Sequence, residues 1–456
     1  MLFIGSGRDP DDNHPIIGRG NMDATVRKPP TKKDVFRVVS GNFLEMFDFM
    51  VYGFYAAAVA KAVFPNDNEF VSLMLSLVTF GVGFLMRPLG AIVLGAYIDR
   101  HGRRAGLVMS LAIMSVGVAL IAFTPTYASI GIAAPILVLI GRLLQGFSAG
   151  AESGGVSVYL SEIATPGNRG FYVSWQSASQ QVAVVFAAVI GVTLRGLLTE
   201  EQMLSWGWRI PFLIGCLIIP VLFWIRRSMQ ESEDFAQRAK HRRVTLGEIY
   251  RSLLQNWAIV LKAVLLVTLT SVFFYMITAY TPTYARQVLG LSDRDSFIVT
   301  VCVGLANFVW VPVMGAVSDR VGRLPVLLTF SALIGVTAYP IMAWLVSDPS
   351  FGRLLAALMW MSFLYGGYQG VMVVTLTEIM PAEVRATGFS LAYSLAQAIF
   401  GGFTPAICTY LIHASGNKAM PGLWLACAAM FSIVGALTLY RNAHIARRSA
   451  PSASLA

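Results

Sequence analysis

Six ionisable residues lie inside long apolar stretches of this sequence, where a charged side chain is costly. Moving a charge to the centre of a bilayer costs about 2.5 to 3.5 kcal/mol on insertion scales, so such residues usually face a cavity. The forked guanidinium of arginine suits a carboxylate ligand, and a carboxylate can take up and release protons. These residue types predict a site for an acidic solute that also exchanges protons. The six are Glu45, Asp48, Arg87, Arg142, Glu152 and Lys262.

The first apolar stretch carries a polar stripe. Asn42, Glu45, Asp48 or Phe49, and Tyr52 recur at steps of three and four residues, which places them on one face of a helix. A polar stripe on an apolar helix is expected to face inward, toward a substrate site. Alternatively, Glu45 and Asp48 are helix-end carboxylates at the cytoplasmic boundary, if the span starts at about Phe36.

Arg87 precedes Pro88 in the second span, where a proline is expected to kink the helix. Its guanidinium is predicted either to contact a substrate carboxylate or to form an internal ion pair with Glu45 or Asp48. The two roles do not exclude each other. Lys262 stands near the start of the seventh span, so it is expected to extend toward the cytoplasmic surface rather than bind substrate.

The fourth span places Arg142 and Gln145 on one helical face with Glu152. Arg142 is a second candidate for binding a substrate carboxylate. Glu152 is either a proton carrier beside it or a charge used in helix packing.

Neutral polar side chains complete a candidate substrate pocket. Amides and hydroxyls can bind carboxylates or a hydroxyl without adding a fixed charge. The alternative for each alone is a hydrogen bond between helices. They are Gln176, Gln180 and Gln181 in the fifth span, Tyr365, Tyr368 and Gln369 in the tenth, and Gln397 in the eleventh.

The elements that hold these residues are membrane-spanning helices. Of 456 residues, 56% are hydrophobic and 13% are charged, against about 25% charged in soluble proteins. About twelve stretches reach the length of about 20 residues that a bilayer requires. Lys and Arg gather in every second connection, which indicates cytoplasmic termini and argues against nucleic acid as the reason for the net charge of +10.

Two phrases occur twice along the chain. The phrase at 95–104 recurs at 315–324, 220 residues later, and Glu162 with its neighbours recurs at Glu378, 216 residues later. One nearly constant offset indicates a duplicated six-helix unit, and parallel repeats place substrate near the midplane between the halves. The predicted fold is an all-α polytopic membrane protein with two pseudo-symmetric six-helix bundles. Its predicted parts are a disordered cytoplasmic N-terminus (1–33), the first bundle (34–227), a cytoplasmic linker (228–255), the second bundle (256–441) and a cytoplasmic tail (442–456).

Several of these motifs resemble those of a known family. The stretches at 95–104 and 142–146 resemble signature motifs of the major facilitator superfamily. Those at 41–49, 87–91 and 162–166 resemble its metabolite–proton symporter family, and most closely the group of citrate–proton symporters and tricarballylate permeases. The resemblance implies uptake of citrate or tricarballylate in symport with protons. It also implies a proton-coupling role for the arginine of the fourth-helix motif.

The repeated loop motifs are predicted to be gates. An aspartate here can accept hydrogen bonds from the N–H groups that begin a neighbouring helix and can pair with arginine, which would hold the cytoplasmic side closed. Two pairs, Glu162 with Arg169 and Glu378 with Arg385, are expected to support it. The predicted gate residues are Asp99, Arg100, Gly102, Arg103, Arg104, Glu162, Arg169, Asp319, Arg320, Gly322, Arg323, Glu378 and Arg385.

Electrostatics requires that an imported acid be accompanied by cations. A trianion moving inward against 100 mV faces about 7 kcal/mol, at about 2.3 kcal/mol per charge. If the substrate binds the arginine, Glu45 or Asp48 loses its partner and gains affinity for a proton. We therefore expect protons and an organic anion as partners, with the proton gradient as the driving force and no cofactor or metal.

Other readings stay open at this point. The substrate could be α-ketoglutarate, shikimate or proline/betaine, and a receptor could bind an acid without moving it. No constellation for enzyme catalysis is present in the sequence. We expect a monomer in a bacterial inner membrane, and Met1 and Met22 are both possible starts.

Overall fold

The computed structural model describes residues 42–101, 103–150, 156–158, 160, 161, 164, 165, 167–227, 257–380 and 385–449. Within these ranges the chain is helical with connecting turns and has no strand, as the sequence predicts. The predicted N-terminal segment at 1–33 and the predicted linker at 228–255 lie outside the described residues.

The first half of the fold contains the candidate site residues that lie between positions 42 and 181 of the sequence. Met86 interrupts the helix just before Arg87 and Pro88, where the sequence predicts a kink, and the two parts still form one apolar span, Glu69–Gly95. The half consists of α2 (Asn42–Phe54), α3 (Ala56–Val63), α4 (Glu69–Leu85), α5 (Arg87–His101), α6 (Arg103–Phe123), α7 (Tyr127–Ile130), α8 (Ala133–Ala149), α10 (Arg169–Leu197), α11 (Glu200–Ser205), the 3-10 turn η1 (Gly207–Arg209) and α12 (Ile210–Arg227).

The second half repeats this plan. One element in it is unusual, because the π-helix η3 interrupts the eleventh span, and short π segments inside helices are frequent at functional sites. The half consists of α15 (Trp257–Ile277), α16 (Thr281–Gln287), α17 (Asp293–Val321), α18 (Arg323–Ser347), α19 (Phe351–Ile379), α20 (Arg385–Ala396), η3 (Gln397–Gly401), α21 (Thr404–Ser415) and α22 (Met420–Ser449).

These helices account for the predicted crossings. In the described part of the chain, nine helices are long and apolar enough to span a membrane, and α2 with α3 forms a further span bent by 66°. Helix α8, with 17 residues, and α19, with 29, complete twelve. The apolar part of α22 ends at Arg441, where the second bundle was predicted to end. The helix itself continues to Ser449, into the stretch predicted as a tail.

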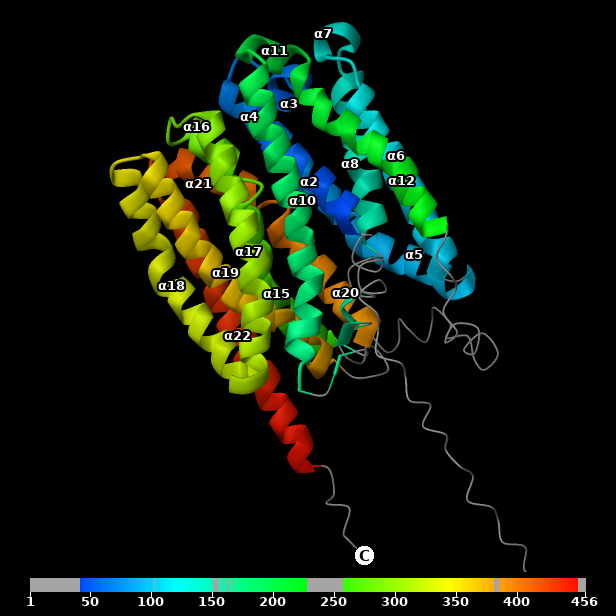
Figure 1. Ribbon diagram of the computed structural model, residues 1–456, viewed down its shortest axis with the longest axis vertical. Coiled ribbons are helices and arrows are strands. Elements are labelled where there is room, and N and C mark those ends of the chain that lie inside the picture. The colour runs from blue at the N-terminus through cyan, green and yellow to red at the C-terminus, as the bar shows by residue number, and fades with distance from the viewer. Residues whose placement is uncertain are drawn as a thin grey trace, which may run out of the picture.

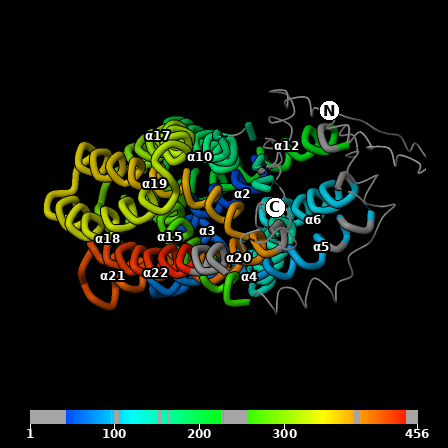
Figure 2. Tube along the Cα trace, turned by 90° about the horizontal axis from the view of Figure 1, so that it is seen from below, coloured from blue at the N-terminus to red at the C-terminus, as the bar shows by residue number. Residues whose placement is uncertain are grey.

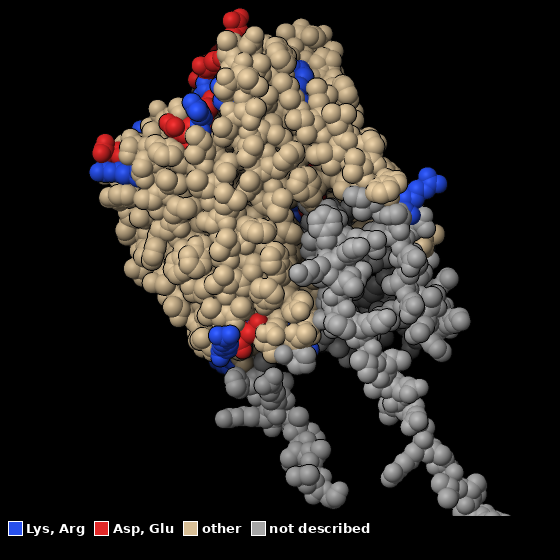
Figure 3. All heavy atoms as spheres, viewed as in Figure 1, with Lys and Arg blue, Asp and Glu red and all other residues tan. Residues whose placement is uncertain are grey.

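The two halves lie side by side and meet along their inner helices (Figures 1 and 2). Helix α10 packs along α17, α5 contacts α20, and α4 contacts η3 and α21. On the outer faces, large apolar side chains such as Leu217, Trp224 and Val336 are about three-quarters exposed. Charged side chains gather toward the two ends of the face in Figure 3, with an uncharged belt between them. This is the surface expected of a protein surrounded by lipid.

Candidate functional site

The first ion pair of the site joins two helices of the first half. Glu45 lies on α2, and its Oε1 is 3.0 Å from Nη2 of Arg87, the first residue of α5. The other terminal nitrogen of Arg87 donates a hydrogen bond to Oε1 of Gln397 in η3, which belongs to the second half. Both charged side chains are at least 94% buried. The internal ion pair predicted for Arg87 is therefore present, and the same guanidinium connects the two halves.

The second ion pair lies beside the first one. Nη1 of Arg142 on α8 is 3.8 Å from Oδ2 of Asp48, one helical turn after Glu45 on α2. Arg142 also donates to Oε1 of Gln145 at 2.8 Å and to the carbonyl oxygen of Phe80 at 3.4 Å. Arg142 is fully buried. Oδ2 of Asp48 accepts no hydrogen bond from any described residue, so this carboxylate is held less firmly than that of Glu45.

Aromatic rings enclose both guanidinium groups. The ring of Phe49 lies between them, 4.6 Å from the guanidinium carbon of Arg87 and 4.4 Å from that of Arg142. Phe84 covers Arg87 at 4.5 Å, and Tyr52 covers Arg142 at 4.7 Å. Such cation–π contacts stabilise a desolvated cation. The sequence named Phe49 only as an alternative to Asp48 on the polar face of the first span, and it did not single out Phe84, because a phenylalanine in an apolar span gives no signal of its own.

Both arginines keep N–H groups for a further acceptor. Among the described residues, Nε of Arg87 and Nε of Arg142 have no hydrogen-bond partner, and the contact from Arg87 Nη2 to Glu45 lacks hydrogen-bond geometry. Buried donors without an acceptor are costly. An anion with several carboxylates could satisfy them, because each carboxylate oxygen accepts and the guanidinium donates in a fixed fork.

The predicted amides of the fifth and tenth spans meet between the two halves. Nε2 of Gln369 on α19 donates to Oγ of Ser177 on α10 at 2.7 Å, and Ser177 donates to Oε1 of Gln176 at 2.8 Å. The hydroxyl of Thr270 on α15 donates to Oε1 of Gln369. Gln369 and Gln176 thus belong to one hydrogen-bonded chain that crosses the interface.

The other neutral candidates have separate surroundings. Gln181 on α10 accepts a hydrogen bond from Nδ2 of Asn307 on α17 at 3.4 Å. Gln180, its neighbour on α10, is buried. The ring of Tyr365 packs edge-on against Phe273 at 5.7 Å. The hydroxyl of Tyr368 donates to the carbonyl oxygen of Leu266 at 2.6 Å and lies 2.5 Å from the hydroxyl oxygen of Ser432, so it joins helices within the second half. The predicted role of Tyr368 in binding substrate has no support from this position.

The predicted latch is present in the second repeat. The two carboxylate oxygens of Asp319 accept hydrogen bonds from the backbone N–H groups of Gly170 at 2.8 Å and Phe171 at 3.0 Å, in the first turn of α10. Arg323 donates to Asp319 at 2.8 Å and to Glu378 at 3.1 Å. The contacts of Asp319 therefore match those predicted from the motif, whereas Glu378, predicted to pair with Arg385, is bound by Arg323.

Close backbone approach surrounds this latch. A Cβ on Gly315 would lie 2.6 Å from the carbonyl oxygen of Gly170, so glycine is required for the two helices to meet. Gly322 has a φ of 99°, which ends α17 and allows the chain to turn into α18. Arg169 and Arg320 are exposed beside it.

Several predicted site residues lie outside the described residues or in helices whose side chains are not described there. Gly102, Glu152 and Glu162 lie outside the described residues. For a second group of predicted residues only the helical backbone is described. They are Asn42, Asp99, Arg100, Arg103, Arg104 and Arg385. Lys262 is half-buried near the start of α15, where it was expected to extend toward an end of the bundle.

An ion-pair cluster at the opposite end also joins the halves. Arg286 of α16 contacts Glu200 of α11 and lies 2.5 Å from Oδ2 of Asp293 on α17. Arg195 at the end of α10 lies 2.7 Å from the same oxygen. Sequence reasoning missed this cluster because its residues lie in connections with no repeated motif. We call Arg195, Glu200, Arg286 and Asp293 the opposite-end cluster.

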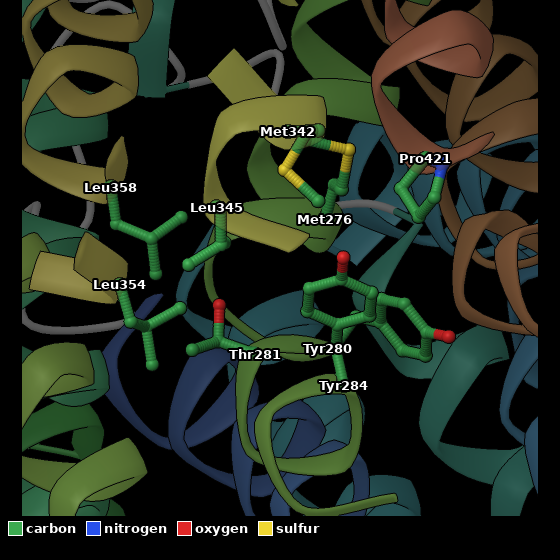
Figure 4. Close-up of a pocket in the computed structure, with 9 residues that line it drawn as sticks. All are labelled: Met276, Tyr280, Thr281, Tyr284, Met342, Leu345, Leu354, Leu358 and Pro421. Atoms are coloured by element: carbon green, nitrogen blue, oxygen red, sulfur yellow. The ribbon is translucent and has the colours of Figure 1, made fainter. Parts of the chain in front are cut away.

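A small cavity lies inside the second half, away from these charges (Figure 4). Its lining includes Met276, Met342, Leu354 and Tyr280, and its volume is about 10 Å³. A space of that size is at the lower limit for one water molecule. The cavity therefore does not compete with the charged interface as the site for an organic acid.

In the described residues, twelve spans form two repeated bundles, the first bundle holds two buried ion pairs, and Arg87 of one pair also bonds to Gln397 of the second bundle; this architecture defines a secondary transporter that works by alternating access. Residues 38–405 match the model of the Major Facilitator Superfamily, and the chain belongs to this family. It is a transporter rather than an enzyme, as the sequence predicts.

Named relatives are similar over nearly their whole length. The chain is 58% identical to the citrate-proton symporter of Salmonella typhi over 406 residues, which are 89% of this chain and 93% of the relative. It is 53% identical to the citrate-proton symporter of Klebsiella pneumoniae over 416 residues, with 91% and 93% covered. Among solved structures, a D-xylose-proton symporter matches with a TM-score of 0.71 at 17% identity, covering 89% of this chain and 96% of that one. The last likeness concerns the fold alone.

Proposed function

We propose that this protein imports citrate together with protons across the bacterial inner membrane, by alternating access between its two halves. The observation that carries the proposal is the pair of buried arginines, each held by a carboxylate of α2 and each with an N–H group that no described residue accepts. The similarity to two named citrate-proton symporters supports citrate as the acid.

Coupling follows from competition for the arginines. When citrate carboxylates bind Arg87 and Arg142, Glu45 and Asp48 lose their cationic partners and are left buried. A buried carboxylate without a partner is neutralised by a proton. Proton binding therefore favours citrate binding and citrate binding favours proton binding, which is the reciprocity that linkage requires. Asp48 is the first proton acceptor in this scheme, because its ion pair is longer than that of Glu45 and its Oδ2 accepts no hydrogen bond from the described residues.

Two contacts between the halves serve as gates in this proposal. The Asp319 latch lies at the end of the bundle where α22 ends, and the opposite-end cluster lies at the other end (Figure 1). Alternating access breaks one of them at a time while the other holds. With both termini cytoplasmic, as the distribution of Lys and Arg indicates, the Asp319 latch is the cytoplasmic gate. We propose that the monomer is sufficient for this cycle.

Uptake of labelled citrate into proteoliposomes tests the proposal. With an inward proton gradient we expect accumulation above the external concentration, and excess citrate should compete more strongly than α-ketoglutarate, shikimate or proline. Binding without accumulation would indicate a receptor, and stronger competition by another solute would replace citrate as the substrate. Collapse of the gradient with a protonophore should abolish accumulation but leave exchange of internal for external citrate.

A further inference from the structure

Two hydroxyl groups on one face of α15 are not explained by the packing around them. Ser271 and Tyr275 are one helical turn apart, so their side chains share a face. Both are at most 1% exposed. Neither hydroxyl has a hydrogen-bond partner among the described residues. We call these two residues the hydroxyl pair.

Two other buried hydroxyls of the same half do have partners. Thr268 on α15 donates to the carbonyl oxygen of Val264 at 2.9 Å, and the hydroxyl of Tyr280 accepts from Thr409 at 3.0 Å. Leaving a buried hydroxyl unpaired costs about 1 to 3 kcal/mol. Serine at 271 and tyrosine at 275 would therefore be poorer choices than alanine and phenylalanine if their role were packing alone.

Tyr275 of the hydroxyl pair faces the charged site from the other half. The ring of Tyr275 packs edge-on against Phe84 at 5.1 Å and Phe80 at 5.9 Å on α4. The same two rings cover the guanidinium groups, Phe84 that of Arg87 at 4.5 Å and Phe80 that of Arg142 at 5.1 Å. Tyr275 is thus one ring away from both arginines.

The π-helix η3 brings a second surface to the same place. A Cβ on Gly401 would lie 3.1 Å from the Tyr275 ring and 3.2 Å from Cβ of Ser271, so η3 lies directly over the hydroxyl pair. At the other end of η3, Gln397 accepts the hydrogen bond from Arg87. One short π segment therefore contacts both the arginine and the hydroxyl pair.

We propose that the hydroxyl pair determines specificity by recognising the tertiary hydroxyl group of citrate. This inference rests on the proposed citrate transport. The arginines take the carboxylates of the substrate, and a neutral group that both donates and accepts suits its hydroxyl. Tricarballylate has the same three carboxylates and lacks only that hydroxyl. It would leave the hydroxyl pair unsatisfied in the bound state, which is how a polar site rejects an analogue that cannot pair with it.

The test compares the two acids on the purified transporter. Competition against labelled citrate uptake gives a half-inhibitory concentration for each acid, and their ratio measures the preference. We expect Tyr275→Phe and Ser271→Ala each to lower the preference for citrate about 2- to 13-fold, the range of one hydrogen bond, by weakening citrate and not tricarballylate. Tyr280→Phe is the matched control, because it also removes a buried tyrosine hydroxyl of the second half and should leave the ratio unchanged.

Thermal unfolding in detergent separates recognition from folding. Because no described residue bonds to either hydroxyl, both variants should unfold at the wild-type temperature or above it. An unchanged ratio in both variants, or equal weakening of both acids, would overturn the inference while citrate uptake itself persisted. Absence of citrate uptake by the wild-type protein would overturn the proposed function and the inference with it.

Discussion

Replacement of Asp319 by alanine should shift the transporter toward the state that is open at the α22 end. The side chain of Asp319 is 4% exposed, and its carboxylate accepts hydrogen bonds from two backbone N–H groups of α10, at 2.8 and 3.0 Å. These two bonds cross between the halves and must break when that end opens. The third bond, from Arg323, lies within one half and persists in either state.

The two crossing bonds set the size of the shift. Hydrogen bonds to a charged group contribute about 1.5 to 3 kcal/mol each. In the open state water replaces part of this, so we take about 2 kcal/mol for the two together. That corresponds to about a 30-fold change in the ratio of open to closed molecules. Asp319→Asn keeps an acceptor oxygen and should give a smaller shift in the same direction.

Distances between spin labels report this equilibrium directly. Labels on the exposed positions Asn168 and Val321 lie on either side of the latch, in a background in which the four free cysteines have been replaced. Asp319→Ala should add a longer distance that is minor in the parent. If the distance distribution of Asp319→Ala matched that of the parent protein, the latch would not hold this end closed.

Three further perturbations address other parts of the account. Gly146→Ala forces a Cβ against the carbonyl oxygen of Gly83 and should lower the unfolding temperature in detergent, whereas Gly196→Ala, with open space around it, should not. Arg286→Ala removes the centre of the opposite-end cluster, so spin labels across that end should move apart. The equilibrium then shifts toward the state open at this end, opposite to the shift that Asp319→Ala causes. Arg142→Lys keeps the charge but loses the fork and the ring contacts, so citrate binding measured by calorimetry should weaken at least about 10-fold; unchanged binding would exclude Arg142 from the site.

Much of the fold could be predicted because it rests on composition and repetition. Membrane length, basic connections and the repeated loop phrase were sufficient for twelve spans in two halves. The contacts of Asp319 were also predictable, because an aspartate near a helix end can accept from the N–H groups that begin a facing helix and can pair with a nearby arginine. The extent of α22 beyond Arg441 was not, since a polar sequence continues a helix without an apolar signal.

The charged residues of the site could be predicted from the sequence, but the rotation of each helix about its axis could not. Arg87, Arg142, Glu45 and Asp48 are conspicuous in apolar spans, but only packing decides which acid meets which arginine. Tyr368 was a candidate from its type and position, yet the rotation of α19 directs it into its own half.

The residues that sequence reasoning missed have a different cause. Tyr275 follows two phenylalanines in an apolar run, where nothing distinguishes a substrate-facing ring from a packing ring. The π-helix η3 arises from local packing and has no pattern in the sequence.

Citrate-induced proton movement tests the central claim most directly. A pH indicator outside proteoliposomes should record proton uptake when citrate is added to the wild-type protein, in step with uptake of labelled citrate. The variant that combines Glu45→Gln with Asp48→Asn should lose the proton signal and gradient-driven accumulation while retaining some citrate exchange. Proton uptake at the wild-type ratio to citrate in that variant would contradict the assignment of these carboxylates as the proton carriers.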